Sequence, residues 1–325
     1  MTVLSEVQAG VLSQDELVAG IIENIITVNQ MYQVLPFDNY EGTGLTVNRE
    51  NALAGAGLAA VGGSLSGAVP ANGIPAIAGV GAGTNFKDPA TWTPETFTLK
   101  TIVGDAEVNG LVQAQLSDFT DQTASQIAAK AKQVGRIYQD LMINGNESVS
   151  TLQFDGLMVL ADSVVTAGTG SGGALSFDLM DAAMDEVKDK DGVVDYIVMA
   201  ARTRRAYKAL LRALGGAAID DVVTLESGDV VIAYEGVPIF KNEYMPTNQG
   251  PTSANTWTSV IFGTFDDGSR QYGISGLTSR NNGGIVVDQV GPKENEDADL
   301  TRVKWYAGLA QFSQKGLTVL NSITN

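Results

Sequence analysis

The sequence predicts a mixed α+β fold in which the helices are segregated and the strands are largely antiparallel. Three observations support this prediction. Apolar side chains recur every three or four residues in several segments, which is the spacing of an amphipathic helix. Apolar and polar side chains alternate in other, shorter segments, which is typical of strands. From about residue 230 onward the strand-like segments dominate the chain.

The first predicted helix precedes a predicted hairpin. Ser13 and Glu16 form a capping box, and apolar side chains then recur at helical spacing to about residue 28. Strands are predicted at Thr43 to Arg49 and at Glu95 to Val103, where apolar and polar residues alternate. Because a long insert separates these two strands, we expect them to form an extended hairpin arm.

A long helix is predicted after the hairpin. Ser117 is its expected cap, and its apolar stripe continues to residue 144. At about 23 residues the helix would be roughly 35 Å long. Further on, Ser176 caps a helix predicted from Phe177 to Lys188, and another helix is predicted from Arg202 to Leu214. The strands predicted in this half are Val193 to Ala200, Val230 to Tyr234, Val237 to Phe240, Thr258 to Phe265, Ile285 to Val290, Thr301 to Phe312 and Gly316 to Leu320.

The insert in the hairpin, Asn51 to Phe86, contains no charged residue although the chain has a net charge of −17. Its many glycines and its prolines exclude a continuous membrane-spanning helix, while its recurring apolar side chains are untypical of a solvated linker. We therefore expect this run to be buried against another copy of the chain; the alternative is a mobile surface loop. The apolar residues expected at that contact are Leu53, Leu58, Val61, Leu65, Val69, Ile74 and Ile77.

The composition excludes several classes of function. The chain has no cysteine and no histidine, which removes disulfides, the usual zinc sites and every Ser-His or Cys-His arrangement. The first basic residue is Arg49, so the N-terminus lacks the positive charge of a secretory signal, and we expect a soluble protein made in a cytoplasm. Its 37 acidic against 20 basic residues argue against general nucleic-acid affinity, although a container for nucleic acid can itself be acidic.

Two patterns could belong to an enzyme, and neither is specific. Residues 168–173 match G-x-G-x-x-G, but the segment before them is not the continuous apolar run of a buried parallel strand, so a glycine-rich turn is favoured over a dinucleotide site. Asp105 with Glu107, and Asp118 with Asp121, could form an acid/base pair, but such pairs arise by chance in an acidic chain. We therefore predict no catalytic, cofactor-binding or metal-binding residue.

The predicted helix from residue 202 to residue 214 concentrates positive charge. Five of the 20 basic residues of the chain lie on it: Arg202, Arg204, Arg205, Lys208 and Arg212. Its apolar stripe, which we expect to be buried with the arginines facing outward, consists of Tyr207, Leu210, Leu211 and Leu214. Two interpretations stay open: a solvated helical face, or salt bridges from Arg202, Arg204, Arg205 and Lys208 to an acidic neighbouring subunit.

The order of these parts resembles that of tailed-bacteriophage major capsid proteins, whose fold is shared by encapsulins and herpesviruses, and the resemblance extends over essentially the whole chain. It begins with the amphipathic N-terminal arm, the apolar-tipped hairpin and the long helix. The later segments that carry it are Phe154 to Leu157, Asp195 to Met199 with the helix after them, Tyr234 to Phe240, Met245 with Pro246, Val260 to Phe265 and Arg302 to Leu309. None of these is an invariant signature, so the resemblance rests on their order and spacing.

The resemblance implies a domain organisation. The implied parts are an N-terminal arm at 1–40, an extended loop at 41–97 that reaches over a neighbour, a peripheral domain at 98–158 and 290–325 with a spine helix at about 118–144, and an axial domain at 159–289. The implied junction between the last two domains consists of Phe154, Asp155, Gly156 and Leu157. We expect Gly156 to supply a backbone conformation that a β-carbon would oppose, Phe154 and Leu157 to supply packing, and Asp155 to bond within its own turn. The four residues would set the relative position of the domains and have no chemical role.

The resemblance also implies a function. The chain would self-assemble as hexamers and pentamers into an icosahedral virion capsid in the host cytoplasm, enclosing double-stranded DNA without reading its sequence and without a membrane. Its further partners would be a separate scaffold protein, a portal and decoration proteins. The run from residue 51 to residue 86 has no lysine, so covalent crosslinking through this loop is not expected. The alternatives are an encapsulin-like compartment around enzyme cargo and, from another class, a soluble carbohydrate-active or nucleotide-binding enzyme.

Overall fold

The computed structural model describes most of the second half of the chain and the segments around the predicted hairpin and long helix. The described residues are 29–52, 89–116, 122–168, 170–188, 192–213, 222–225, 228–250 and 256–325. The predicted N-terminal helix and the cap at Ser117 lie outside them. The chain divides into two compact units, one formed by Met1–Thr43 with Thr98–Asn325 and the other by Gly44–Phe97.

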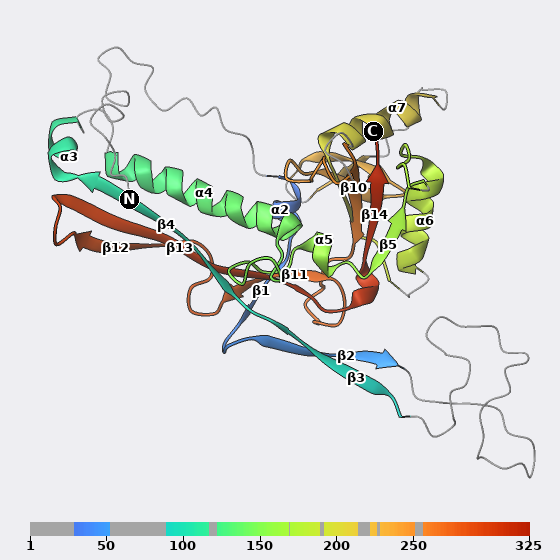
Figure 1. The fold of residues 1–325 in the computed structure, drawn as a ribbon, viewed down its shortest axis with the longest axis horizontal. Helices are drawn as coiled ribbons and strands as arrows, with labels where there is room; N and C mark the ends of the chain where they lie inside the picture. The colour runs from blue at the N-terminus through green and yellow to red at the C-terminus, as the bar shows by residue number, and fades with distance from the viewer. Residues whose placement is uncertain are drawn as a thin grey trace, which may run out of the picture. The chain divides into compact units, whose positions relative to one another are not determined.

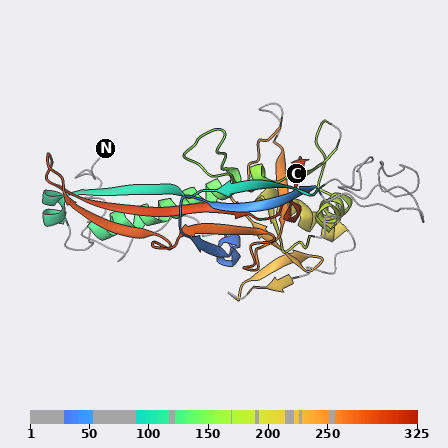
Figure 2. The same cartoon turned by 90° about the horizontal axis from the view of Figure 1, so that it is seen from below.

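The first sheet of the larger unit is built on one long strand, β13 (Ala298–Gln311). Strand β4 (Lys100–Asn109) pairs antiparallel with β13 along one side, as the two ribbons show in Figure 2. Strands β12 (Val286–Pro292) and β11 (Ile274–Ser279) pair antiparallel with successive parts of β13. Strand β1 (Phe37–Tyr40) adds to β11 in parallel, so β1 is an edge strand of this sheet.

The long helix α4 (Gln122–Asn144) runs along β4 and β13 (Figure 1). It has 23 residues and ends at Asn144, as the sequence predicted. Val134, Tyr138 and Met142 are buried on it at steps of four residues, so its apolar stripe packs into the core as an amphipathic helix should.

The second sheet has seven strands in the order β5-β14-β10-β6-β9-β8-β7. Their bounds are β5 Ser163–Thr166, β14 Leu317–Ile323, β10 Thr258–Gly263, β6 Tyr196–Met199, β9 Val237–Lys241, β8 Val230–Tyr234 and β7 Val222–Thr224. Two of its pairings are parallel, β14 with β5 and β6 with β9, and the others are antiparallel. The expectation of largely antiparallel strands is therefore confirmed.

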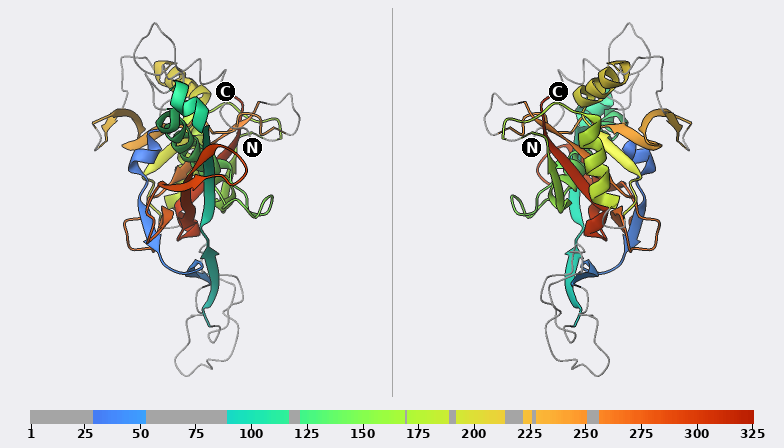
Figure 3. Two further views of the ribbon diagram at one scale, coloured as in Figure 1. Left: turned by 90° about the vertical axis from the view of Figure 1, so that its left-hand side faces the viewer. Right: turned by 90° about the vertical axis from the view of Figure 1, so that its right-hand side faces the viewer.

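Both faces of the second sheet are covered. Along β6, Ile197 and Met199 belong to one apolar cluster, while Tyr196 and Val198 belong to another, because successive side chains of a strand point to opposite faces. The first cluster includes side chains of α6 (Phe177–Lys188) and α7 (Ala201–Ala213), which Figure 3 shows beside the sheet. The second cluster is shared with α4 and with β13 of the first sheet, so one core joins the two sheets.

Short helices lie at the connections. These are α2 (Met31–Val34), α3 (Gly110–Leu116), α5 (Leu157–Leu160) and the 3₁₀ turn η1 (Gln314–Gly316). The sequence predicted none of them, because helices of three to seven residues have too few positions to show a period.

The smaller unit contains an antiparallel hairpin of β2 (Leu45–Ala52) and β3 (Thr91–Phe97). On one face Arg49 lies 3.7 Å from the Glu95 carboxylate and 5.6 Å from the ring centroid of Phe97. The predicted hairpin is confirmed, but the predicted strand from Glu95 to Val103 is wrong, because it is two strands, β3 and β4. The break occurs where the backbone N–H of Leu99 donates to the hydroxyl of Tyr40 (3.1 Å), a partner far away in the sequence.

Candidate functional site: the domain junction and the basic helix

The predicted junction is the exit of a loop, residues 145–156, that closes on itself after α4. The N–H of Gly145 donates to the carbonyl of Leu141 (2.8 Å), and the N–H of Gly156 donates to the carbonyl of Gly145 (2.9 Å). The carbonyl of Gly156 then accepts from Val159 (3.0 Å) and Leu160 (2.9 Å), which starts α5. The loop therefore begins and ends at one backbone crossing, where the chain passes from α4 toward the second sheet.

Gly156 is required by space and not by its backbone angles. Its φ of −88° and ψ of 175° are extended values that any residue adopts, so the expectation of a special conformation is wrong. The expectation that a β-carbon would be opposed is right for another reason. A β-carbon at Gly156 would lie 2.6 Å from the carbonyl oxygen of Leu141, 2.8 Å from that of Ile143 and 2.8 Å from the nitrogen of Gly145. All three are backbone atoms, which cannot rotate away as a side chain can.

The other junction residues bond and pack around this crossing. One carboxylate oxygen of Asp155 accepts from the N–H of Glu147 (2.8 Å), so it closes the loop across eight residues where the sequence interpretation expected a bond within its own turn. Phe154 is 3% exposed, its ring lies 5.5 Å from that of Tyr138, and Leu157 is fully buried in the same cluster. Each junction residue therefore either bonds to the backbone or packs in the core.

A lysine that the sequence interpretation missed also holds this loop. The ammonium of Lys100, the first residue of β4, lies 2.7 Å from the carboxylate of Glu147 and donates to the carbonyl of Thr151 (3.0 Å). Its side chain is only 15% exposed. The loop is therefore attached to the first sheet as well as to α4. No sequence signal identifies Lys100, because its partners lie about fifty residues away.

The basic residues of α7 do not all face solvent. Arg205 is exposed and Arg204 and Lys208 are half-buried, but the guanidinium of Arg202 donates to the carbonyl of Thr256 (2.5 Å). Arg202 is therefore held by its own chain, with its Nε buried, and its predicted salt bridge to a neighbour stays a prediction. The predicted salt bridges of Arg204, Arg205 and Lys208 to a neighbour stay a prediction.

The opposite side of α7 is buried, as its apolar stripe predicted. Tyr207 is 2% exposed and donates its hydroxyl hydrogen to the carbonyl of Ala233 in β8 (3.0 Å). Leu210 and Leu211 are partly buried against the same cluster. Leu214, the fourth predicted member of the stripe, lies outside the described residues.

From residue 53 onward, the charge-free run also lies outside the described residues. This applies to all seven of its apolar residues expected at a subunit contact, namely Leu53, Leu58, Val61, Leu65, Val69, Ile74 and Ile77. Their predicted contact with a second copy is therefore untested.

The patterns that could belong to an enzyme have structural explanations. In the glycine-rich segment, Gly168, Gly170 and Gly172 all have positive φ, and α6 begins only at Phe177, so the described residues form a turn that does not open the helix. A strand, β5, does precede this turn, but it is an edge strand with alternate residues exposed, which explains why it lacks a continuous apolar run.

The described carboxylates of the proposed acid/base pairs are engaged in ion pairs. Arg302 binds both oxygens of Asp105 (2.8 and 2.9 Å) and lowers its pKa, and the ammonium of Lys293 lies 2.7 Å from Glu107. Asp118 and Asp121 lie outside the described residues. Within the described segments, no cluster of three or more acidic side chains is placed to hold a metal ion, and no helix is both long and apolar enough to cross a membrane.

Comparison with solved structures finds the same architecture over the full length. A chain of an encapsulin complex from Synechococcus elongatus matches with a TM-score of 0.68 at 17% identity, covering 99% of this chain and 97% of that chain. A capsid chain of cyanophage A-1(L) matches with a TM-score of 0.69 at 13% identity, covering 99% and 100%. The capsid of a native GTA particle matches with a TM-score of 0.62 at 15% identity, covering 97% and 96%.

The chain has the capsid fold. This is the fold that the resemblance predicted, a mixed α+β fold found in tailed-phage capsids and in an encapsulin. No protein-family model matches the chain, and no curated protein matches its sequence. The capsid fold was recognisable from the order of the segments in the sequence and from the arrangement in space.

The predicted domain boundaries stay a prediction, and two strands pair with a sheet whose other strands come mainly from the other predicted domain. Strand β11 lies within the range 159–289 of the expected axial domain, yet it pairs with β13 in the first sheet. Strand β14 lies within the range 290–325 of the expected peripheral domain, yet it pairs with β10 and β5 in the second sheet. In its last third the chain therefore passes from the second sheet (β10) to the first (β11 to β13) and back to the second (β14).

Proposed function

We propose that this chain is a major capsid protein that self-assembles as hexamers and pentamers into an icosahedral shell enclosing packaged double-stranded DNA. The observation that carries the proposal is the capsid fold over the whole chain. The matches cover between 96% and 100% of this chain and of the solved chains. The net charge of −17 suits a wall that encloses DNA without binding it tightly. The role is structural, so we assign no catalytic residue and no cofactor.

Within this function the two sheets belong to separate domains. We assign β4, β11, β12 and β13 with α4 to the peripheral domain, to whose sheet the arm adds β1, and the seven-stranded sheet with α6 and α7 to the axial domain. The arm would be residues 1–40 and the extended loop residues 41–97. The scaffold, the portal and decoration proteins would be further partners, and assembly would take place in the host cytoplasm to give a virion capsid.

A second candidate is an encapsulin-like compartment, because an encapsulin chain matches with a TM-score of 0.68. Electron microscopy of the purified full chain tests both candidates against the enzyme alternative. Uniform closed shells support a capsid or a compartment, whereas monomers or small oligomers at every concentration and salt contradict both. Nuclease treatment of the shells then separates the two candidates, because a capsid protects DNA and a compartment protects protein cargo.

We expect the charge-free run to be covered by a neighbouring subunit in the shell. Amides of residues 51–86 should exchange with solvent quickly in isolated subunits and slowly in shells, since we expect the apolar side chains of the run to gain partners on assembly. Hydrogen exchange followed by mass spectrometry of both states measures this. Equal protection in the two states contradicts the expectation, and so does efficient shell formation after the run is replaced by a short Gly-Ser turn.

The exposed basic side of α7 is expected to make salt bridges between subunits. The double variant Arg204→Glu and Arg205→Glu should then block assembly, while the neutral variant Arg204→Gln and Arg205→Gln should only weaken it and flatten its dependence on salt. Light scattering over a salt series measures assembly, and circular dichroism verifies that the subunits stay folded. If the glutamate variant assembles normally and its salt response is unchanged, the basic residues of α7 form a solvated helical face instead.

A further inference from the structure

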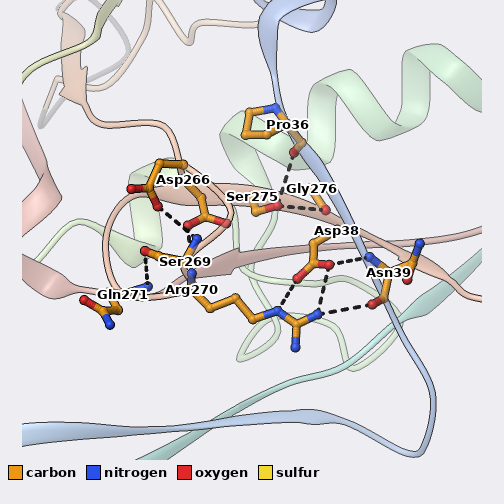
Figure 4. A network of polar contacts seen from close by, with 10 residues as sticks. Pro36, Asp38, Asn39, Asp266, Ser269, Arg270, Gln271, Ser275 and Gly276 are labelled. Atoms are coloured by element: carbon orange, nitrogen blue, oxygen red, sulfur yellow. Dashed lines mark hydrogen bonds and ion pairs between the residues drawn. The ribbon is translucent and has the colours of Figure 1, made fainter.

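The loop between β10 and β11 is built around a buried carboxylate. Asp266 is 8% exposed, and its oxygen accepts the N–H of Arg270 (3.1 Å), which folds the loop back on itself (Figure 4). The N–H of Asp266 donates to the carbonyl of Ile274 (3.0 Å), and the N–H of Ile274 donates to the carbonyl of Thr264 (2.9 Å). Residues 264–274 therefore form a closed loop with a fixed backbone.

This loop holds Arg270 in a conformation that arginine rarely adopts. Its φ is +57°, in the left-handed region where asparagine and glycine are favoured and a long side chain is uncommon. A residue kept in such a conformation is a candidate for a function of its side chain.

The side chain of Arg270 reaches strand β1. Its Nε lies 2.6 Å from Oδ2 of Asp38, its Nη2 donates to Oδ1 of the same carboxylate (2.9 Å), and Nη2 also approaches the carbonyl of Asn39 (3.4 Å) (Figure 4). The guanidinium thus holds a side chain and the backbone of consecutive β1 residues. It meets both oxygens of the Asp38 carboxylate, one through a hydrogen bond and one through an ion-pair contact, and this carboxylate raises the pKa of Arg270.

Other contacts also bear on the register of β1. The carbonyl of Pro36, just before the strand, accepts from the N–H of Gly276 (2.8 Å) and the hydroxyl of Ser275 (3.2 Å), and the ring of Phe37 lies against Gly276 and 5.9 Å from the ring of Tyr138. These contacts bury little of the strand.

Strand β1 has four residues, it lies at the edge of its sheet, and Phe37 remains 42% exposed, so among its residues only Tyr40 is buried. Its parallel pairing places Asp38 opposite Leu277. Register is weakly specified where little apolar surface is buried, so a directional contact such as that of Arg270 with Asp38 has a large share in choosing it.

The position of β1 matters because the chain leaves the larger unit directly after it. The unit ends at Thr43 and resumes at Thr98, and the smaller unit contains the hairpin between them. The hydroxyl of Tyr40 accepts the N–H of Leu99 (3.1 Å), so the outgoing and returning segments are bonded to each other at the last residue of β1. A shift of β1 along β11 would move this bond and both ends of the hairpin insert.

We propose that Arg270 is a positioning residue that holds β1 in register on β11 and thereby fixes the point from which the extended hairpin leaves the subunit. The second half of this statement rests on the proposed function, in which the hairpin must reach a neighbouring copy. The first half concerns the isolated subunit alone.

The variant Arg270→Asn tests the first half. Asparagine accepts the left-handed conformation more readily than arginine, so the loop keeps its backbone and only the guanidinium is lost. Amides of residues 37–40 should exchange at least about tenfold faster than in the wild-type subunit, because two hydrogen bonds to a charged group are removed. Arg270→Lys keeps the charge without the fork and should give an intermediate rate.

Arg280→Asn is the matched control. Arg280 contacts Glu41 just beyond β1, but through one 3.4 Å contact between side chains that are 67% and 70% exposed. Exposed pairs of this kind contribute little, so exchange at residues 37–40 should stay within about twofold of wild type. Wild-type exchange rates in Arg270→Asn would overturn the proposal, and so would equal acceleration in Arg280→Asn.

Electron microscopy of the same variants tests the second half. Arg270→Asn subunits should remain folded yet give fewer or misshapen shells, whereas Arg280→Asn should give normal shells. Normal shells from a variant that has lost protection at β1 would overturn the link to the hairpin. If the wild-type chain itself forms no shells, the proposed function fails, while the exchange rates still decide whether Arg270 holds β1.

Discussion

Replacing Gly156 with alanine is expected to lower the free energy of unfolding by about 3 kcal/mol, and valine should prevent correct folding of the junction. The added β-carbon would lie 2.6 to 2.8 Å from three backbone atoms, so α4 and the loop after it must separate. Overpacking of this kind costs about 1 to 3 kcal/mol, and the bond from Gly156 to the carbonyl of Gly145 contributes about 1 kcal/mol more. Thermal and urea unfolding of the subunit measure this loss.

Gly135 provides the control for this prediction. It lies in the middle of α4, and a β-carbon there would meet nothing within 4 Å. Gly135→Ala should therefore raise the free energy of unfolding by about 0.5 to 1 kcal/mol, because alanine loses less backbone entropy than glycine in a helix. If the two alanine variants have the same stability, the crowding at Gly156 is not important.

The Gly156→Val substitution also tests the link between the junction and assembly. In the proposed shell the junction is repeated in every subunit, so a small displacement between the two sheets would disturb closure of the whole lattice. We expect the Gly156→Val protein to give misfolded or aberrant assemblies by electron microscopy. Shells of normal diameter from this variant would contradict the assignment of residues 154–157 as the element that sets the two domains relative to each other.

Local signals predicted the longer described helices well. The helix expected from Phe177 to Lys188 has those bounds in the structure, and the hydroxyl of its expected cap, Ser176, accepts the N–H of Leu179 (3.3 Å). The long helix ends at Asn144, where the periodic pattern stops. Periodicity and capping depend on residues within one or two turns of each other, so the sequence alone contains this information.

Contacts between distant segments were not predictable in the same way. Strand β11 was missed because it is buried along nearly its whole length and includes Gly276, where a β-carbon would lie 2.6 Å from the ring of Phe37 in β1. A strand that must leave room for a neighbouring aromatic ring shows neither alternation nor a continuous apolar run. The division of β3 from β4 was missed for a similar reason: it lies where the N–H of Leu99 bonds to the hydroxyl of Tyr40, a residue distant in the sequence.

The sequence identified the junction and the basic helix, but the structure gives different physical reasons for both. Gly156 was selected as a residue with special backbone angles, whereas its angles are ordinary and three distant backbone atoms require it. Arg202 was grouped with its neighbours by charge, whereas the carbonyl of Thr256 holds it. In both cases sequence reasoning identified the residue and its segment, but the physical cause lies in tertiary packing.

Truncating Tyr138 to alanine is expected to lower the free energy of unfolding by about 3 to 5 kcal/mol, the range for large aromatic residues in cores. Tyr138 is fully buried on α4 and meets four other rings. The distances from its ring centroid are 5.5 Å to Tyr32, 5.9 Å to Phe37, 5.5 Å to Phe154 and 4.6 Å to Trp305. These rings come from the segments before and within β1, from the junction and from β13, so one cavity would loosen several elements at once.

The hydroxyl of Tyr138 adds a smaller, separable contribution. It donates to the carbonyl of Gly308 (3.1 Å), and burial raises the pKa of Tyr138, so the hydroxyl keeps the hydrogen that it donates. Tyr138→Phe should lower the free energy of unfolding by about 1 kcal/mol, because the carbonyl loses a partner while the ring contacts stay. Urea unfolding at neutral pH measures both variants.

The preceding residue of α4 supplies the control for the alanine variant. Ile137 is 36% exposed, and its truncation to alanine should have a much smaller effect, because part of its surface already contacts water. Equal losses in Ile137→Ala and Tyr138→Ala would mean that helix propensity, and not the ring cluster, determines the effect. In the proposed shell, Tyr138→Ala subunits should also assemble poorly, because the ring cluster connects β1, the junction and β13, which must keep one arrangement in every copy.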